Sequence, residues 1–178
     1  MCPADRLPVQ PLVASQVKLS RVLLILYLLT LLWLVLFKLS YDILAILASY
    51  NTRSVNLVPF VTLGQTGLSE TISNLVIFIP FGLLLSLNFK RTRLSRLLTA
   101  VFVFSAAVET LQFIFAIGTT DATDLVTNTF GGLVGLVLYR LVSKVVKTAI
   151  LDRVITAVGL TLFVAFILLR VLVFKVRY

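Results

Sequence analysis

The sequence contains no histidine and a single cysteine, Cys2, in its 178 residues. Without histidine the chain lacks the commonest metal ligand and the usual proton shuttle at neutral pH. One cysteine excludes an intramolecular disulfide. Charge is scarce as well, because 13% of the residues are charged, against about 25% in ordinary soluble domains. Polar chemistry therefore has to come mainly from carboxylates, amides and hydroxyls.

The sequence consists largely of long apolar runs. The chain is 60% hydrophobic with a mean hydropathy of +1.09, and several runs approach the roughly 20 residues that span a bilayer. We predict an all-α, polytopic helix bundle in the cell membrane. About five transmembrane helices are expected, over residues 19–37, 71–87, 97–117, 123–142 and 154–174. They form one domain, residues 18–178, after a proline-containing cytoplasmic N-terminal tail, residues 1–17.

The net charge of +9 comes from basic residues that fall mostly at the ends of the predicted helices. The positive-inside rule then places the N-terminus inside and the C-terminus outside, with the basic turns at 90–96 and 140–153 in the cytoplasm. Arg170, Lys175 and Arg177 then fall outside, against the rule, so either these charges are tolerated there or the last segment does not fully cross; five full spans are favoured. Such residues suit anionic lipid headgroups, and nucleic acid is not an expected partner.

Three of the seven acidic residues lie in the apolar stretch 107–135. A charged group in hydrocarbon is costly unless it is paired, wetted or functional. The predicted orientation brings these carboxylates and several amides to the outer side, where we expect a shared polar pocket. The candidate ligand-binding residues are Asn56, Asn74, Glu109, Gln112, Asp121, Asp124 and Asn128.

Each of these residues also has a structural interpretation. Asp121 or Asp124 could cap the helix that starts there, and Asn74 or Asn128 could hydrogen-bond between helices. Glu109 lies too deep to be a cap, so a functional role is favoured for it. Two glycines in a GxxxG pattern favour close helix packing, and these are Gly131 and Gly135.

The polar residues and their neighbours resemble the VanZ-like family of membrane proteins. The motifs that carry the resemblance are Asn56-Leu57-Val58-Pro59-Phe60, Asn74 to Gly82, Glu109-Thr110-Leu111-Gln112, and Asp121, Asp124, Asn128, Gly131 and Gly135. The resemblance covers about half the chain, from Asn56 to Tyr139. One departure is that Gly118 is followed by Thr119, where the family commonly has an arginine.

The resemblance implies a link to glycopeptide antibiotic resistance, chiefly reduced sensitivity to teicoplanin-type drugs. We expect a non-enzymatic envelope protein without a cofactor, whose outward pocket binds a membrane lipid or a lipid-linked or cell-wall ligand. The alternative is a membrane enzyme that acts on a lipid headgroup, with the three carboxylates holding a divalent cation such as Mg²⁺. A proton-coupled carrier with Glu109 as its titrating group, and a bundle whose polar groups are purely structural, are further hypotheses.

Overall fold

The computed structural model describes residues 10–37, 54–56, 58–60, 65–116 and 119–177. Each of the five helices in this part contains a stretch of 21 to 25 residues that is long and apolar enough to cross a membrane. This result confirms the predicted all-α membrane bundle. The helices are α1 (Gln10–Phe37), α3 (Gln65–Asn88), α4 (Leu94–Phe115), α5 (Ala122–Val145) and α6 (Thr148–Arg177).

All five helices begin before the spans predicted from the sequence, and the shift is six residues or more in α1, α3 and α6. Helix α1 starts at Gln10, inside the segment expected to be a tail, and α3 starts at Gln65, six residues before the predicted span. The prediction counted apolar residues suited to hydrocarbon, whereas a helix can continue through polar residues beyond the membrane. The extra turns of α3 matter because they bring polar side chains into the helix next to Asn74.

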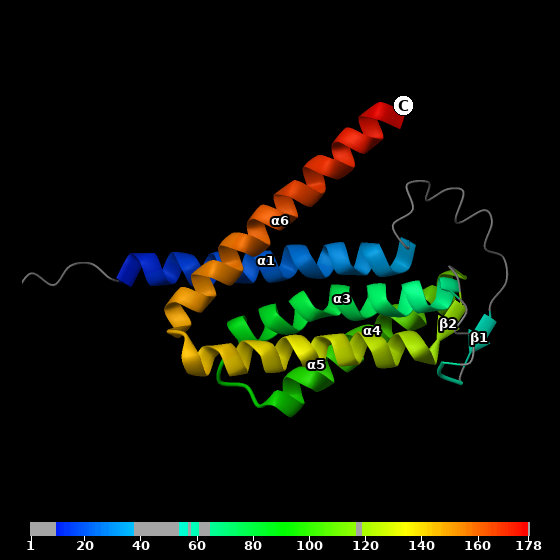
Figure 1. Ribbon diagram of the computed structural model, residues 1–178, viewed down its shortest axis with the longest axis horizontal. Coiled ribbons are helices and arrows are strands. Elements are labelled where there is room, and N and C mark those ends of the chain that lie inside the picture. Colours follow the sequence, from blue (N-terminus) through cyan, green and yellow to red (C-terminus); the bar gives the residue numbers. More distant parts are fainter. Residues whose placement is uncertain (1–9, 38–53, 57, 61–64, 117–118, 178) are drawn as a thin grey trace, which may run out of the picture.

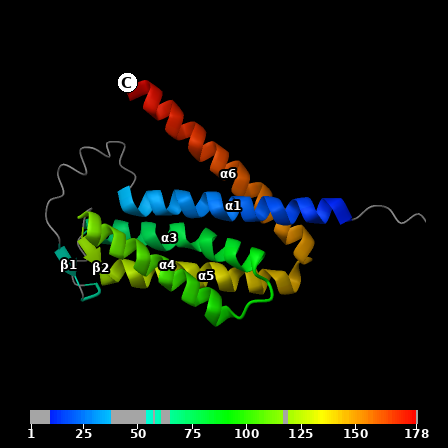
Figure 2. The ribbon, with the colours of Figure 1, turned by 180° about the vertical axis from the view of Figure 1, so that it is seen from behind.

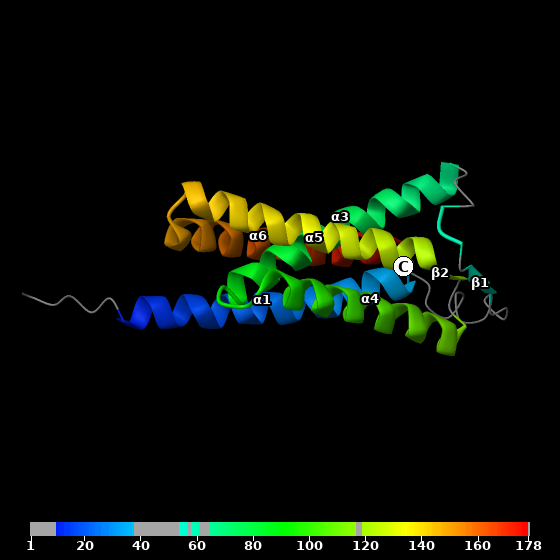
Figure 3. The same cartoon turned by 90° about the horizontal axis from the view of Figure 1, so that it is seen from below.

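Consecutive helices run in opposite directions, with α1, α3, α4 and α5 lying roughly along one long axis (Figures 1 and 3). The α3–α4 and α5–α6 turns share one end of the bundle, which the predicted orientation places in the cytoplasm. Two short strands, β1 (Ser54–Asn56) and β2 (Thr119–Asp121), lie at the opposite end (Figure 2). After that predicted orientation, we call the end with the two helix turns the cytoplasmic end and the end with the two strands the outer end.

Helices α3 and α5 form the tightest pair in the bundle because glycines remove side chains from the contact. A Cβ added to Gly131 would overlap the carbonyl oxygen of Leu75, and one added to Gly135 would overlap that of Ile79. Gly82 on α3 meets the α5 backbone in the same way. Such close backbone approach allows packing without a hydrophobic driving force, which lipid does not supply between helices.

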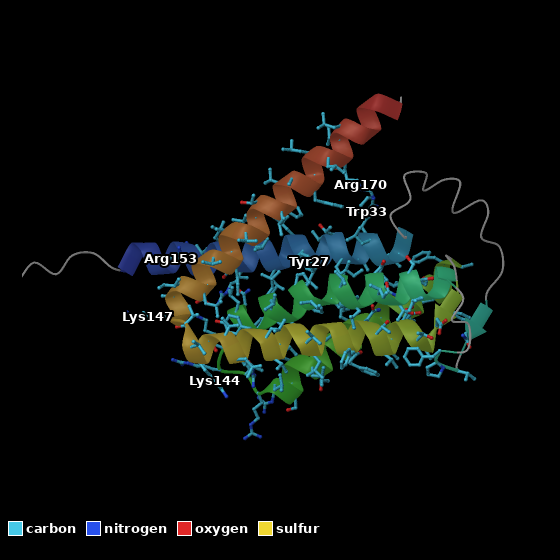
Figure 4. The ribbon with its side chains drawn as sticks, in the orientation of Figure 1. Tyr27, Trp33, Lys144, Lys147, Arg153 and Arg170 are labelled. Atoms are coloured by element: carbon cyan, nitrogen blue, oxygen red, sulfur yellow. The ribbon has the colours of Figure 1, made fainter. Side chains whose placement is uncertain are left out.

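Helix α6 is the peripheral element. Only 6% of its membrane window is buried, whereas the other four windows are 28–39% buried. Its first half packs on α1, and its second half diverges from the bundle (Figure 1). Near the outer end the Arg170 guanidinium lies 4.3 Å from the centre of the Trp33 ring on α1 (Figure 4). This cation–π contact ties α6 to α1 beyond the point where they diverge.

Candidate functional site

Two loops pair with each other at the outer end. Strand β1 precedes α3, β2 precedes α5, and the two pair in parallel with Asn56 opposite Asp121. The Asn56 side chain reinforces the pairing, because its Nδ2 donates to Asp121 Oδ2 at 3.3 Å. Its Oδ1 accepts from the backbone N–H of Val58. Asn56 therefore holds the loop before α3 against the start of α5.

Asp121 is the N-cap of α5 and the centre of this loop network. Its Oδ1 accepts from the backbone N–H of Thr123 at 2.8 Å, which satisfies one of the free donors at a helix start. The Thr123 hydroxyl in turn accepts from the N–H of Phe60, a residue in the left-handed conformation with φ of 64°. The Asp121 carboxylate is therefore held by neutral donors from both loops.

Glu109 reaches the same network from α4. Its Oε2 accepts from the backbone N–H of Asp121 at 3.2 Å, and the residue is 5% exposed. This position lies at the N-terminal end of α5, where the partial positive charge of the helix dipole favours a carboxylate. The geometry gives Glu109 a structural partner that the sequence did not indicate, because the partner is a main-chain group of a loop.

The side chains of Gln112 and Asn128 are fully buried, and in each the amide nitrogen donates a hydrogen bond. Gln112 Nε2 donates to the carbonyl of Val35 on α1 at 3.1 Å, and Asn128 Nδ2 donates to the Ser105 hydroxyl on α4 at 3.0 Å. Their carbonyl oxygens, Gln112 Oε1 and Asn128 Oδ1, have no hydrogen-bond partner among the described residues. A buried acceptor without a donor is costly and calls for an explanation.

A polar cavity of about 520 Å³ opens beside this network. All five helices contribute to its wall, and two of its residues, Glu70 and Asp124, are carboxylates. No lysine or arginine is among the described residues that line it. Its polar lining consists of Ser69, Glu70, Ser73, Asn74, Gln112 and Asp124, and its apolar lining of Leu34, Val35, Ile77 and Phe166.

The cavity contains three of the residues singled out from the sequence, Asn74, Gln112 and Asp124, which come from three different helices. Asn56, Glu109, Asp121 and Asn128 do not line it. The first three of these form the loop network behind the cavity, and Asn128 bonds to Ser105 between α4 and α5. Of the seven residues predicted from the sequence, three therefore line the cavity and four form hydrogen bonds behind it.

Glu70 was missed from the sequence. We expected the second span to start at Thr71, so Glu70 fell in a loop. In the structure it lies in α3, one helical turn from Asn74, and both line the cavity. The four-residue spacings of Glu70 with Asn74 and of Ser69 with Ser73 were the signal available in the sequence.

An apolar groove of about 400 Å³ adjoins the polar cavity. Leu34 on α1 and Phe166 on α6 line both spaces, so the two meet there. From that junction the groove extends between α1, α3 and α6 toward Leu23 and Val154. It passes Tyr27, whose hydroxyl donates to the carbonyl of Ile77 at 2.6 Å in the turn before Pro80. The groove and the cavity together form one elongated space, which is polar at the outer end and apolar along the rest.

The described part of the chain contains no group of three His, Cys, Asp or Glu side chains arranged to hold a metal ion. In particular, Asp121 is committed to Thr123 and Asn56, and it does not line the cavity with Asp124. A three-carboxylate cation site, the basis of the enzyme alternative, therefore gains no support from this geometry.

Comparisons with known proteins agree on one family. The sequence model of the VanZ/LLP1 family matches residues 24–143. Protein VanZ of Enterococcus faecium is 52% identical over 152 residues, which cover 85% of this chain and 92% of that protein. No solved structure matches. The chain therefore belongs to the VanZ/LLP1 family, as a membrane protein with several spans.

Proposed function

We propose that this protein binds an amphiphilic ligand of the cell envelope at its outer end, and that binding lowers sensitivity to glycopeptide antibiotics of the teicoplanin type. The ligand is a membrane lipid or a lipid-linked cell-wall precursor, and the protein acts in the cell membrane without catalysis. The observation that carries the proposal is the junction of a polar cavity and an apolar groove at Leu34 and Phe166.

The chemistry of the cavity favours a particular kind of headgroup. Glu70 and Asp124 are acceptors with negative charge, and the free Oε1 of Gln112 is a further buried acceptor. Because no basic side chain lines the described wall, a phosphate there would be unfavourable. Hydroxyls, amide N–H groups and ammonium groups fit instead, as found in the sugar or peptide part of a cell-wall precursor.

The groove supplies the complementary apolar half. Leu23 and Leu34 are eleven residues apart on α1, which corresponds to about 16 Å of helix. Its wall consists almost entirely of apolar side chains, with Thr30 and the committed hydroxyl of Tyr27 as the polar exceptions. An alkyl chain fits such a surface, and α6, which forms one wall of the groove, is the least buried of the described helices. A ligand with both parts would occupy both spaces.

The link to antibiotic sensitivity rests on family membership. The relative named Protein VanZ covers most of the chain, and the resemblance in the sequence motifs implies glycopeptide resistance. A protein that holds an amphiphile of the envelope at the outer surface could change how a drug reaches that surface. The cavity residues then become the residues on which resistance depends.

The direct test is drug sensitivity at matched expression. Asp124→Asn and Asn74→Ala alter the cavity, whereas Thr99→Ala removes an exposed hydroxyl that bonds only to its own helix, at Ser95. We expect both cavity variants to restore teicoplanin sensitivity in a host that the parent protein protects, and the Thr99 variant to protect fully. Full protection by both cavity variants would overturn the proposal.

A further inference from the structure

A second cavity, of about 720 Å³, lies at the cytoplasmic end between α1, the α3–α4 turn and α6. Four basic residues line it, and they come from three separate parts of the chain. Arg21 belongs to α1, Lys90 and Arg91 to the α3–α4 turn, and Arg153 to α6. Figure 4 shows Arg153 at this end of the bundle, near Lys147. The positive-inside rule requires basic residues in these segments, but it does not require them to surround one hollow.

Asp152 is the one carboxylate among the described residues of this lining, and its charge is already paired. Asp152 forms an ion pair with Lys90 through Oδ2 and accepts a hydrogen bond from the Tyr139 hydroxyl at 2.7 Å through Oδ1. By contrast, Arg21, Arg91 and Arg153 make no side-chain hydrogen bond or ion pair with any described residue. The cavity therefore presents three guanidinium groups that no described side chain engages, and its carboxylate is paired with Lys90.

This arrangement fits a phosphate group. Guanidinium groups bind phosphate through paired N–H donors, which gives geometry as well as charge. Thr148 and Ala149, the first residues of the 30-residue helix α6, line the same space, so the positive end of a helix dipole points in the same direction. The chemistry is the opposite of that in the outer cavity, which is lined by carboxylates.

The position of the cavity identifies the source of the phosphate. The membrane windows of α1 and α6 begin at Gln16 and Thr148, and that of α3 ends at Asn88. All three residues line the cavity, so it lies at the level of the lipid headgroups. The apolar groove begins about two turns further into the membrane, at Leu23 and Val154. A phospholipid whose phosphate is bound here would therefore have its acyl chains in apolar surroundings.

We infer that this cavity is a binding site for the phosphate of an anionic phospholipid of the cytoplasmic leaflet, held by Arg21, Arg91 and Arg153. The site is separate from the outer cavity in position, in charge and in the residues that line it. It anchors the cytoplasmic ends of α1 and α6 through a shared lipid. The proposal of phospholipid binding here can therefore fail while that of ligand binding in the outer cavity holds, and the reverse is also true.

The test is lipid binding to the purified full-length protein in a neutral detergent, with phosphatidylglycerol as the probe and native mass spectrometry as the readout. One variant combines Arg21→Gln, Arg91→Gln and Arg153→Gln. Its matched control removes three exposed basic residues outside the cavity lining, by Arg93→Gln, Arg96→Gln and Lys144→Gln. We expect the first variant to raise the dissociation constant about tenfold or more and the control less than about threefold.

Equal weakening in both triple variants would overturn the inference, because it would show a diffuse charge effect. Full competition by millimolar inorganic phosphate would also overturn it, because the ligand would then be free phosphate. The single change Asp152→Asn separates binding from folding, since it releases Lys90 into the cavity without removing a cation. The inference predicts tighter phosphatidylglycerol binding by this variant, and weaker binding contradicts it.

Discussion

The backbone N–H of Asp121 donates a hydrogen bond to Oε2 of Glu109 across 3.2 Å. This contact joins α4 to the loop pair at the outer end, because Glu109 belongs to α4 and Asp121 is both the end of β2 and the N-cap of α5. It explains how a glutamate can be kept in an apolar environment. Glu109 thus supports the cavity wall, whereas Asp124 lines the cavity itself.

The contact predicts different losses of stability for two changes at Glu109. Glu109→Gln keeps an oxygen that can accept from Asp121 but removes the charge, so we expect a loss of about 1 kcal/mol in stability. Glu109→Leu removes the acceptor entirely and should cost about 2–3 kcal/mol or more. Thermal unfolding in detergent, followed by circular dichroism, measures both. Equal stability of the parent and the leucine variant would show that the contact is dispensable.

The glycine contacts between α3 and α5 predict a position-dependent cost of adding one methyl group. Gly135→Ala places a Cβ against the main chain of α3 at Ile79, which cannot move without displacing the helix. Gly159→Ala meets only the side chain of Leu23, which can change rotamer. We expect a loss of about 1–3 kcal/mol at Gly135 and a clearly smaller loss at Gly159. Melting temperatures of the two variants in the same detergent provide the comparison, and a larger loss at Gly159 would contradict this packing.

The stacking of Arg170 on Trp33 predicts a local change in the outer half of α6. Trp33→Leu removes the aromatic face but keeps an apolar side chain, at a cost of about 0.5–2 kcal/mol. Because α6 is otherwise little buried, we expect faster hydrogen exchange in its segment around Phe166 and Arg170. The segment near Asp152, held by Lys90 and Tyr139, serves as the internal control. Unchanged exchange around Arg170 would show that the stacking does not hold the helix.

A non-enzymatic role predicts that the lipids of the cell are bound but not altered. Lipid mass spectrometry of cells with the parent protein, the Asp124→Asn variant and no protein should give the same set of headgroups. The lipids that copurify with the protein should nevertheless differ between the parent and the variant, because the cavity lining has changed. A new headgroup species that depends on Asp124 would instead favour the enzyme.

Much of this architecture was accessible from the sequence because it depends on local periodicity and hydropathy. The five helices follow from apolar runs, and the glycine pattern of α5 predicts a close helix contact, which the structure places against α3. The start of α3 was misplaced because hydropathy does not register polar helical turns beyond the bilayer. That single error excluded Glu70 from the candidate site.

The parts that could not be predicted depend on contacts between distant segments. The pairing of β1 with β2 involves two three-residue strands that are 63 positions or more apart and have no recognisable pattern of their own. Whether Asp121 caps the helix or binds a ligand depends on that pairing, in which Asp121 bonds to Asn56 and Thr123, whereas Asp124 lines the cavity. The divergence of α6, which shapes the apolar groove, likewise depends on tertiary packing.

The proposed function requires the outer cavity to be open to the exterior of the cell, and the accessibility of introduced cysteines measures this. In a Cys2→Ser background, Asn74→Cys places a thiol in the outer cavity and Asn88→Cys places one in the cytoplasmic cavity. A membrane-impermeant maleimide is added to intact cells and then to permeabilised cells. We predict that the cysteine at position 74 is labelled in intact cells and the one at position 88 only after permeabilisation. Labelling at position 74 only after permeabilisation, or not at all, would contradict the account.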